Sequence, residues 1–504
     1  MPGGSKTSPA LCAACGAALS YYLLFPLMRS GHIGVSVFLA LAFVPVAVLC
    51  LSRVLASFPA AVGADRETAR VLRALPASLT AFAAGLALGI GAGAGVSHGP
   101  VFGVPREAVT GVSGVLLDDP RPVSGGRAMA TLSLRSALGA AGVRATATGE
   151  LTVFFREENA ERLREFGRGT EVFAEGRLQS TDRGYSFGAD SLHVTAPAGS
   201  PDRFRTKLRL DLARRFADAP GEAAWGGLAL ALLLGVRDNL DSGLTTLYRN
   251  AGISYILALS GMHLAVIIAL VSFLLKKPLG VRPAAIAGAV VIIAYCLIVG
   301  PLPSLYRSAL MYVLGVLAVL GMLKRESLSV LSMAFVVQLV FAPQAGVSVS
   351  FVLSYLAMVG ILVPGRSLGG LLRGRVPPFV LGPFALSVGA FVGTAGVVAW
   401  VFGDIRPVGI FAGLVVAPLT TVFMVGSMAW LAVDVVLPGL SPLLSRPLSL
   451  LYRAMEETAR LAGFLPGVRV SPYLVLLFSL VLAVGLVLLD RRLRARRGRL
   501  EPFA

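Results

Sequence analysis

Long apolar runs recur along most of this chain. The hydrocarbon core of a bilayer is about 30 Å thick, so a transmembrane helix needs about 20 consecutive, mainly apolar residues. Runs of this kind predict spans near 10–28, 32–52, 75–97, 251–275, 283–300, 304–323, 328–342, 347–363, 379–402, 406–437 and 471–489. The pattern therefore predicts a polytopic α-helical membrane protein with about ten or eleven spans.

Between residues 99 and 200 the apolar runs give way to short stretches in which apolar and polar side chains alternate, as they do in half-buried strands. Residues 156–169 have instead the pattern of a helix or helical turn. The alternation predicts strands near 108–117, 128–135, 144–155, 170–178 and 185–195. Short strands in this succession favour an inserted β-rich domain built as a small closed barrel of the OB type.

Two shorter segments connect this insertion to the later spans. Residues 203–224 (RFRTKLRLDLARRFADAPGEAA) predict a basic amphipathic helix that lies on the membrane and leads back into it. The apolar run 226–236 is too short to span, which predicts a re-entrant segment or one packed inside the protein. The predicted domains are an N-terminal membrane region, an OB-like domain, an amphipathic linker, a transmembrane channel domain and an arginine-rich tail, at 1–98, 99–200, 201–224, 225–490 and 491–504.

Composition supports a membrane protein, and the positions of the charges orient it. The chain is 56% hydrophobic with a mean hydropathy of +0.78, which excludes an ordinary soluble globular protein. Its 45 Lys and Arg outnumber its 27 Asp and Glu, and cytoplasmic loops are enriched in Lys and Arg. The basic loops carry Arg53, Arg66, Arg70 and Arg73; Lys276, Lys277 and Arg282; Lys324 and Arg325; and Arg366, Arg373 and Arg375. Placing these loops inside predicts a multi-pass protein of the cytoplasmic (inner) membrane with a cytoplasmic N-terminus and an extracytoplasmic β domain.

The basic C-terminal segment RRLRARRGRL (491–500) does not fit this alternation. Counting one span for each later run places the segment outside, against the positive-inside rule. Two interpretations would restore the rule: Pro418 breaks the run 406–437 into two pieces, or residues 441–466 dip into the bilayer. The side of the tail therefore stays open at this point.

The reactive side chains form no metal or catalytic motif. Cys12 and Cys15 have the C-x-x-C spacing of some zinc and redox sites, but no second nearby pair completes a metal site, so we interpret them as buried small residues. Between Asp241 and Asp404 only Glu326 is acidic, whereas the same interval holds ten Lys or Arg. A carboxylate metal site or proton relay in these spans is therefore disfavoured, and no cofactor is predicted. A path lined by hydroxyls, backbone dipoles and cations would suit an anionic solute instead.

The apolar run 251–270 (AGISYILALSGMHLAVIIAL) carries polar residues that a plain anchor does not need, because polar groups in hydrocarbon are costly unless they have partners or line a wet cavity. The residues of interest within it and just ahead of it are Arg249, Ser254, Ser260, Gly261 and His263. Ser260 and His263 would share one helix face. A Ser–His hydrolase is disfavoured, because such a pair supplies neither a nucleophile elbow nor an orienting acid.

Two later runs also carry polar residues. Arg307 follows Tyr306 near the start of a predicted span, and Ser350 and Ser354 lie four apart, so they share a helix face. Arg307 has two interpretations: it snorkels to the interface beside an aromatic belt residue, or it is a cation at the mouth of a path that meets phosphates. The serines either bond carbonyls and neighbouring helices or line the same path.

The run LALALLLGVRDNLDSGLTTLYRNAGISYILALSGMHLAVI (228–267) resembles the signature of the ComEC family of competence DNA-uptake proteins. The matching positions are Gly235, Gly252, Ser254, Ser260, Gly261 and His263. Further on, the family's RA-x-M-like, FxLSxxA and re-entrant FG…iPl patterns are matched at Arg307, Ala309 and Met311; at Ser350, Phe351, Leu353, Ser354 and Ala357; and at 401–419 with Pro418. The β-rich region resembles the family's N-terminal OB-like domain, so the resemblance covers nearly the whole chain.

This resemblance implies a membrane channel that moves single-stranded DNA across the cytoplasmic membrane in natural competence, as a passive conduit. The OB-like domain would receive the strand by stacking and electrostatics. The implied pathway or DNA-contact residues are Arg249, Ser254, Ser260, Gly261, His263, Tyr306, Arg307, Ser350 and Ser354. The implied partners are single-stranded DNA, the lipid bilayer, a cytoplasmic DNA-translocating motor, a DNA receptor and a separate nuclease; an oligomer is left open.

The chain departs from the family pattern in three places. Val236 and Arg237 stand where the family often has an acid followed by a base, and Tyr255 replaces the usual histidine after Ser254. Many members continue into a metallo-β-lactamase-like domain with a His-rich metal motif, whereas this chain has four scattered histidines and no H-x-H pattern. We therefore expect no catalytic residues, no metal and no enzyme activity in this polypeptide.

Two other functions remain open. The first is a transporter or exporter of another anionic or lipidic solute on the same fold, and the second is a membrane scaffold without a path. A conduit predicts that Ser260, His263 and Arg307 converge, whereas a scaffold predicts that they point to separate helix contacts.

Overall fold

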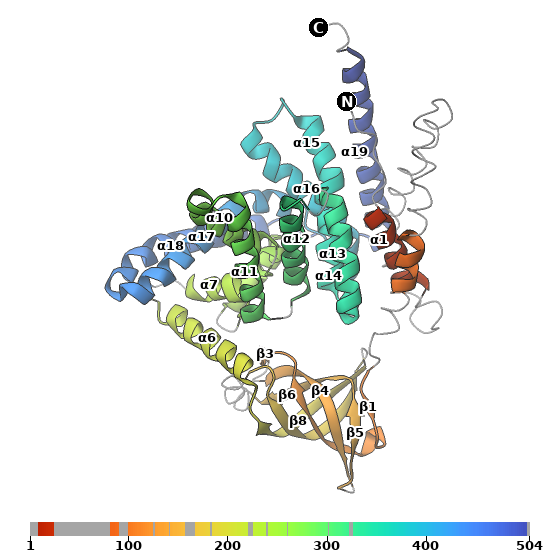
Figure 1. Cartoon of the computed structure of the whole chain (residues 1–504), viewed down its shortest axis with the longest axis vertical. Helices are drawn as coiled ribbons and strands as arrows, with labels where there is room; N and C mark the ends of the chain where they lie inside the picture. The colour runs from red at the N-terminus through yellow and green to blue at the C-terminus, as the bar shows by residue number, and fades with distance from the viewer. Residues whose placement is uncertain are drawn as a thin grey trace.

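The computed structural model describes residues 9–24, 81–89, 99–123, 127–140, 142–156, 167–181, 184–219, 225–237, 240–259, 261–300, 302–321 and 326–500. The predicted span 32–52, most of the span 75–97 and the central part of the helix predicted at 156–169 lie outside these residues. Figure 1 shows the β strands at one end of the molecule and the last turns of the C-terminal helix at the opposite end, with the other helices between them.

Six of the described helices or continuous helical stretches are long and apolar enough to cross a membrane. They are α10 (Gly261–Leu279), α11 (Val281–Val299), α14 (Val349–Gly360) continued through a π-helical turn into α15 (Arg366–Leu372), α16 (Pro378–Phe402), α17 (Gly409–Val436) and the apolar part of α19 (Pro472–Leu500). The protein is therefore a polytopic helical membrane protein, as predicted. The count of ten or eleven spans stays a prediction.

Four further apolar helices are shorter than a full crossing. They are α1 (Pro9–Leu19), α7 (Trp225–Leu234), α12 (Pro303–Val319) and α13 (Ser327–Phe341). Helix α12, with 17 residues, is shorter than the span predicted at 304–323, whereas α13, with 15 residues, is as long as the run predicted at 328–342. All ten residues of α7 are buried, which agrees with the interpretation of 226–236 as a segment packed inside the protein. Trp225 lies there in an aromatic cluster with Phe216, Phe423 and Trp430.

The prediction of one continuous span at 251–275 is wrong. The chain there forms α8 (Ser242–Asn250), the short α9 (Ser254–Leu257) and only then α10. Gly252 has a φ of +71°, and a Cβ on it would lie 2.8 Å from Arg406 Cβ and 3.2 Å from Gly409 Cα. The break is thus set by close packing against a segment more than 150 residues further on, which no local pattern contains.

The structure contradicts the interpretation in which Pro418 breaks the run 406–437 into two pieces. Helix α17 runs unbroken through Pro418 for 28 residues. The segment after it forms a separate helix, α18 (Ser441–Gly463), which buries one face that includes Ser445, Tyr452 and Met455. Helix α19 then carries the arginine-rich tail to the end of the molecule opposite the β strands (Figure 1).

The β-rich region is an eight-stranded sheet that closes on itself. Its strands are β1 (Val101–Phe102), β2 (Val109–Leu116), β3 (Arg121–Val123), β4 (Arg127–Gly139), β5 (Arg144–Thr148), β6 (Glu150–Arg156), β7 (Glu171–Thr181) and β8 (Gly184–Ala196). The predicted strands are confirmed, except that 144–155 is divided at Gly149, whose φ is +102°.

Five of these strands make the barrel. β4 pairs with β2 and β6, β2 with β7, β7 with β8, and β8 runs parallel to β6, so the ring closes. This is the Greek-key arrangement of an OB-type barrel, as predicted. Alternate side chains point inward, so that Val112, Val172 and Phe187 have no exposed surface. We call residues 101–196 the β module.

Helix α6 (Ser200–Ala217) connects the β module to the helical half (Figure 1). Arg205, Thr206 and Phe216 are buried on it. Part of its basic face is therefore turned toward the protein. That the helix lies on the membrane stays a prediction.

Candidate functional site

Arg307 is buried inside the helical half, on the second turn of α12. Its residue is 6% exposed. Nε donates to Ser354 Oγ at 2.7 Å, Nη2 donates to Ser308 Oγ at 3.2 Å, and the guanidinium lies 6.0 Å from the ring centre of Tyr355. This geometry excludes the snorkelling interpretation. Within the described part of the chain, no carboxylate forms a salt bridge with Arg307, so its charge is stabilised by hydroxyls and an aromatic face.

The start of α10 lies directly against this arginine. A Cβ on Gly261 would lie 2.8 Å from Ser308 Oγ and 3.3 Å from Arg307 Nη2. His263, two residues further along α10, has no exposed surface. Ser260 lies outside the described residues. The structure therefore brings together Gly261, Arg307 and Ser354 among the predicted residues. We call Gly261, Arg307, Ser308, Ser354 and Tyr355 the arginine cluster.

A buried glutamine that was not among the predicted residues extends the arginine cluster. Tyr355 Oη donates to Gln338 Oε1 at 2.9 Å, and Gln338 Nε2 donates to the carbonyl of Pro303 at 2.9 Å, at the start of α12. Gln338 thus links α13, α14 and α12. Its signal was available, because it is a lone amide in the apolar run 328–342.

The interrupted segment between α8 and α10 has carbonyls that no helix uses, and three distant side chains bind them. Arg406 donates to Asn250 O at 2.6 Å, Arg237 donates to Leu257 O at 2.9 Å, and Ser304 donates to Leu259 O at 2.7 Å. Irregular backbone is tolerated in a membrane protein only where its polar groups are satisfied or face water. These contacts show how the break in front of the arginine cluster is stabilised.

The other predicted site residues lie outside this cluster. Arg249, Ser254 and Ser350 are exposed, and Tyr306 is 38% exposed. Ser350 is one turn before Ser354 on α14 but does not reach Arg307 in the structure, so only part of the predicted serine face takes part. Tyr355, not the neighbouring Tyr306, is the aromatic partner of the arginine.

A second set of arginines lies on the outside of the β module, each beside an aromatic ring. Arg106, Arg127 and Arg144 lie 4.8, 6.0 and 5.5 Å from the ring centres of Tyr185, Phe154 and Phe173, in that order. Arg106 also donates to the Tyr185 hydroxyl at 2.8 Å. Flat rings flanked by guanidinium groups are the elements with which OB folds bind single strands.

The described residues contain no group of three or more His, Cys, Asp or Glu side chains placed to hold a metal ion.

The fold and the buried arginine cluster define a class: a multi-pass helical membrane protein with a buried, hydroxyl-bound arginine and an OB-type module. The family model described as Competence protein matches residues 232–492. Since this is more than half of the chain, the protein belongs to the competence protein family, the ComEC-type family.

One relative is an uncharacterized protein of Aquifex aeolicus (strain VF5), which is 27% identical over 217 residues. The match covers 43% of this chain and 50% of the relative. The similarity therefore spans half of that protein's length.

Proposed function

We propose that the protein is a conduit through which single-stranded DNA crosses the cytoplasmic membrane. The observation that carries this proposal is Arg307, a buried guanidinium that is held by hydroxyls and stands beside the start of α10. A buried arginine is costly. Held by neutral partners, its charge stays available to a passing phosphate, whereas a carboxylate would neutralise it.

The β module would receive the strand. Its arginine and aromatic pairs offer charge for phosphates and rings for bases, which favours a nucleic acid over a small anion or a lipid. Replacing Phe154 and Phe173 by Ala should weaken binding of an oligonucleotide to the full-length protein in nanodiscs, by about 1–3 kcal/mol for each lost stacked base. Unchanged affinity would contradict this role.

The orientation follows from the ends of the molecule. The basic tail of α19 lies opposite the β module (Figure 1), and the positive-inside rule places basic segments in the cytoplasm. We therefore infer that the protein lies in the inner membrane with its β module on the extracytoplasmic side and its basic tail in the cytoplasm. Labelling of single cysteines by a membrane-impermeant reagent in intact cells tests this assignment: a labelled tail would contradict it.

The main test compares DNA uptake by cells that carry wild-type protein, Arg307→Gln or Arg307→Lys at matched expression. We expect Arg307→Gln to lower internalised DNA by about tenfold or more while DNA bound at the cell surface stays normal, because a lost charged hydrogen bond is worth about 1.5–3 kcal/mol. Lysine should restore uptake only in part, since it keeps the charge but loses the planar fork.

Arg446→Gln is the matched control, because this arginine is exposed on α18 away from the cluster. Normal uptake in Arg307→Gln cells would remove the conduit and bring forward a transporter or exporter of another anionic or lipidic solute. Equal losses in the Arg307 and Arg446 variants would point to a general effect of charge.

We assign no chemical step to this polypeptide. Degradation of the other strand would belong to a separate nuclease, capture to a DNA receptor and the driving force to a cytoplasmic motor. Cleavage of labelled single-stranded DNA by the purified protein with Mg²⁺ or Mn²⁺ would contradict the first assignment.

A further inference from the structure

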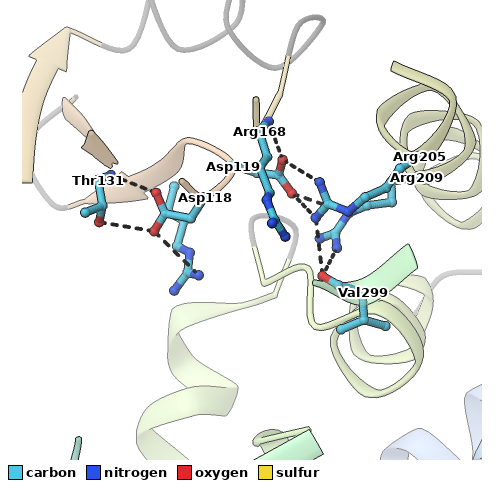
Figure 2. Close-up of polar contacts among 8 residues, drawn as sticks. Asp118, Asp119, Thr131, Arg168, Arg205, Arg209 and Val299 are labelled. Carbon is cyan, nitrogen blue, oxygen red and sulfur yellow. Dashed lines mark hydrogen bonds and ion pairs between the residues drawn. The ribbon is translucent and has the colours of Figure 1, made fainter. Parts of the chain in front are cut away.

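A carboxylate of the β module, Asp119, lies between two arginines of α6 (Figure 2). Arg205 binds it with both terminal nitrogens, Nη1 to Oδ1 at 3.1 Å and Nη2 to Oδ2 at 2.8 Å. Arg209 Nε lies 3.7 Å from the same Oδ2, and the backbone N–H of Arg168 donates to Oδ1 at 3.0 Å. The carboxylate is thereby held from its own module and from α6 together.

The same two arginines also hold the end of α11. Arg205 Nε donates to Ile298 O at 2.9 Å, and Arg209 Nη1 donates to the same carbonyl at 3.2 Å. Arg205 Nη2 donates to Val299 O at 3.3 Å, and Arg209 Nη1 donates to it as well (Figure 2). The last carbonyls of a helix have no partners within it and favour cations. One pair of guanidinium groups therefore connects the β module, α6 and a membrane-spanning helix.

The backbone on both sides makes room for this contact. Gly300 caps α11 with a φ of +103°, and a Cβ on it would lie 3.1 Å from Arg205 Nη2. Gly167, with a φ of +66°, would bring a Cβ against Thr206 and within 3.2 Å of Asp119 Oδ1. The side chains of Arg205 and Arg209 are only 8% and 14% exposed, so solvent and salt screen the contact less than they screen a surface ion pair.

The neighbouring carboxylate serves as an internal comparison. Asp118 accepts from the backbone N–H of Thr131 at 2.7 Å and from its hydroxyl at 3.4 Å, and it lies 3.9 Å from Arg121. All of these partners belong to the β module, as Figure 2 shows for Thr131. The two adjacent aspartates thus have different partners: Asp118 contacts residues of the β module, whereas Asp119 also contacts α6.

We propose that Asp119, Arg205 and Arg209 form a latch that fixes the β module against the end of α11, and that Asp119 is thereby a positioning residue for passing nucleic acid from the module to the helical half. The second part rests on the proposed function, and the first does not. A strand bound on a module that turned freely would meet the helical half in many orientations, whereas the latch selects one.

The experiment compares full-length wild-type protein, Asp119→Asn and Asp118→Asn in lipid nanodiscs by hydrogen–deuterium exchange. In Asp119→Asn, amides of α6 and of residues 295–300 should exchange about tenfold faster or more, with β2 and β4 unchanged, because the charged contact to α6 is lost while the barrel is intact. In Asp118→Asn, amides of β2 and β4 should exchange faster, while those of α6 and of residues 295–300 stay unchanged. Asp119→Glu, which keeps the charge, should recover part of the protection.

Unchanged exchange in α6 and at 295–300 in Asp119→Asn would overturn the latch. Faster exchange throughout β2 and β4 in that variant would also overturn it, because Asp119 would then be a residue of barrel stability. The positioning role is tested by DNA uptake in cells. Cells that carry Asp119→Asn should bind DNA at the surface normally but internalise several-fold less of it. Normal internalisation in Asp119→Asn cells, when Arg307→Gln lowers internalisation in the same strain, would overturn the positioning role alone and leave the proposed function standing.

Discussion

At position 307 a guanidinium is held inside the helical half by the hydroxyls of Ser308 and Ser354. The hydrogen bond from Nε to Ser354 is short, 2.7 Å, whereas Nη2 and Nη1 donate at 3.2 and 3.5 Å to Ser308 Oγ and Met311 Sδ. Neutral partners stabilise a buried charge less than a carboxylate would, so each hydroxyl matters for stability. The chemistry of the cluster therefore depends on which serine of α14 reaches the arginine.

Ser354→Ala should lower the free energy of unfolding by about 1–3 kcal/mol, because it leaves a buried charged donor without its acceptor. Ser350→Ala, on the same helix but exposed, should change it by less than about 0.5 kcal/mol. Thermal unfolding of both variants in detergent checks the pair. Equal effects would mean that the Arg307–Ser354 contact contributes little.

The decisive feature at the scale of elements is the interruption between α8 and α10. It depends on contact between two glycines, because a Cβ on Gly409 would strike the carbonyl of Gly252. The freed carbonyls are then bound by Arg237, Ser304 and Arg406. The first turn of α17 thus packs directly against the interruption that precedes α10.

Gly409→Ala should destabilise the protein and lower DNA uptake, because α17 must move away from the interruption to admit the methyl group. Gly315→Ala on α12 is the control: a Cβ added there would have no other atom within 4 Å, so this variant should be neutral or stabilising by up to about 1 kcal/mol. The thermal unfolding midpoints of the two variants, each compared with wild type, measure this difference in stability. Retained stability in Gly409→Ala would show that the contact is not needed.

At the scale of the whole molecule, the contact of Asp119 with Arg205 and Arg209 joins the β module to the helices. Burial by itself would raise the pKa of Asp119, but the hydrogen bond from Arg205 and the charges of Arg209 and Arg205 outweigh it, so this pKa lies below the ordinary carboxyl value. A lowered pKa in the folded protein means that the contact is complete above the unfolded value of about 3.9 and is lost only as the pH falls through the folded value.

We therefore expect the orientation of the β module to stay constant from pH 8 to about 5 and to change only below about 4. The charged groups that face Asp119 are Arg205 and Arg209 on α6, with Asp118 and Arg121 on its own side; the arginines stay charged throughout. Distances between a spin label on the module and one on α11, in a cysteine-free background, measure this. A change between pH 8 and 5 would assign the junction to another titrating group.

The sequence by itself determined the class of the protein and most of its elements. Period-two alternation located the main strands, and apolar runs located α11, α16, α17 and α19, because these signals are local and repeat within each element. It also singled out Arg307 as unusual, since a charge in an apolar run is costly wherever it points.

Only the tertiary structure decided the contacts between distant segments. It placed Ser354 rather than Ser350 on Arg307, broke the run 251–275 where Gly252 meets Gly409, and chose Asp119 over Asp118 for the contact with α6. The two serines share one helix face and the two aspartates are adjacent, so within each pair the residues differ chiefly in their remote neighbours. The period of a helix or strand determines which residues share a face, but the packing of the whole chain determines what that face meets.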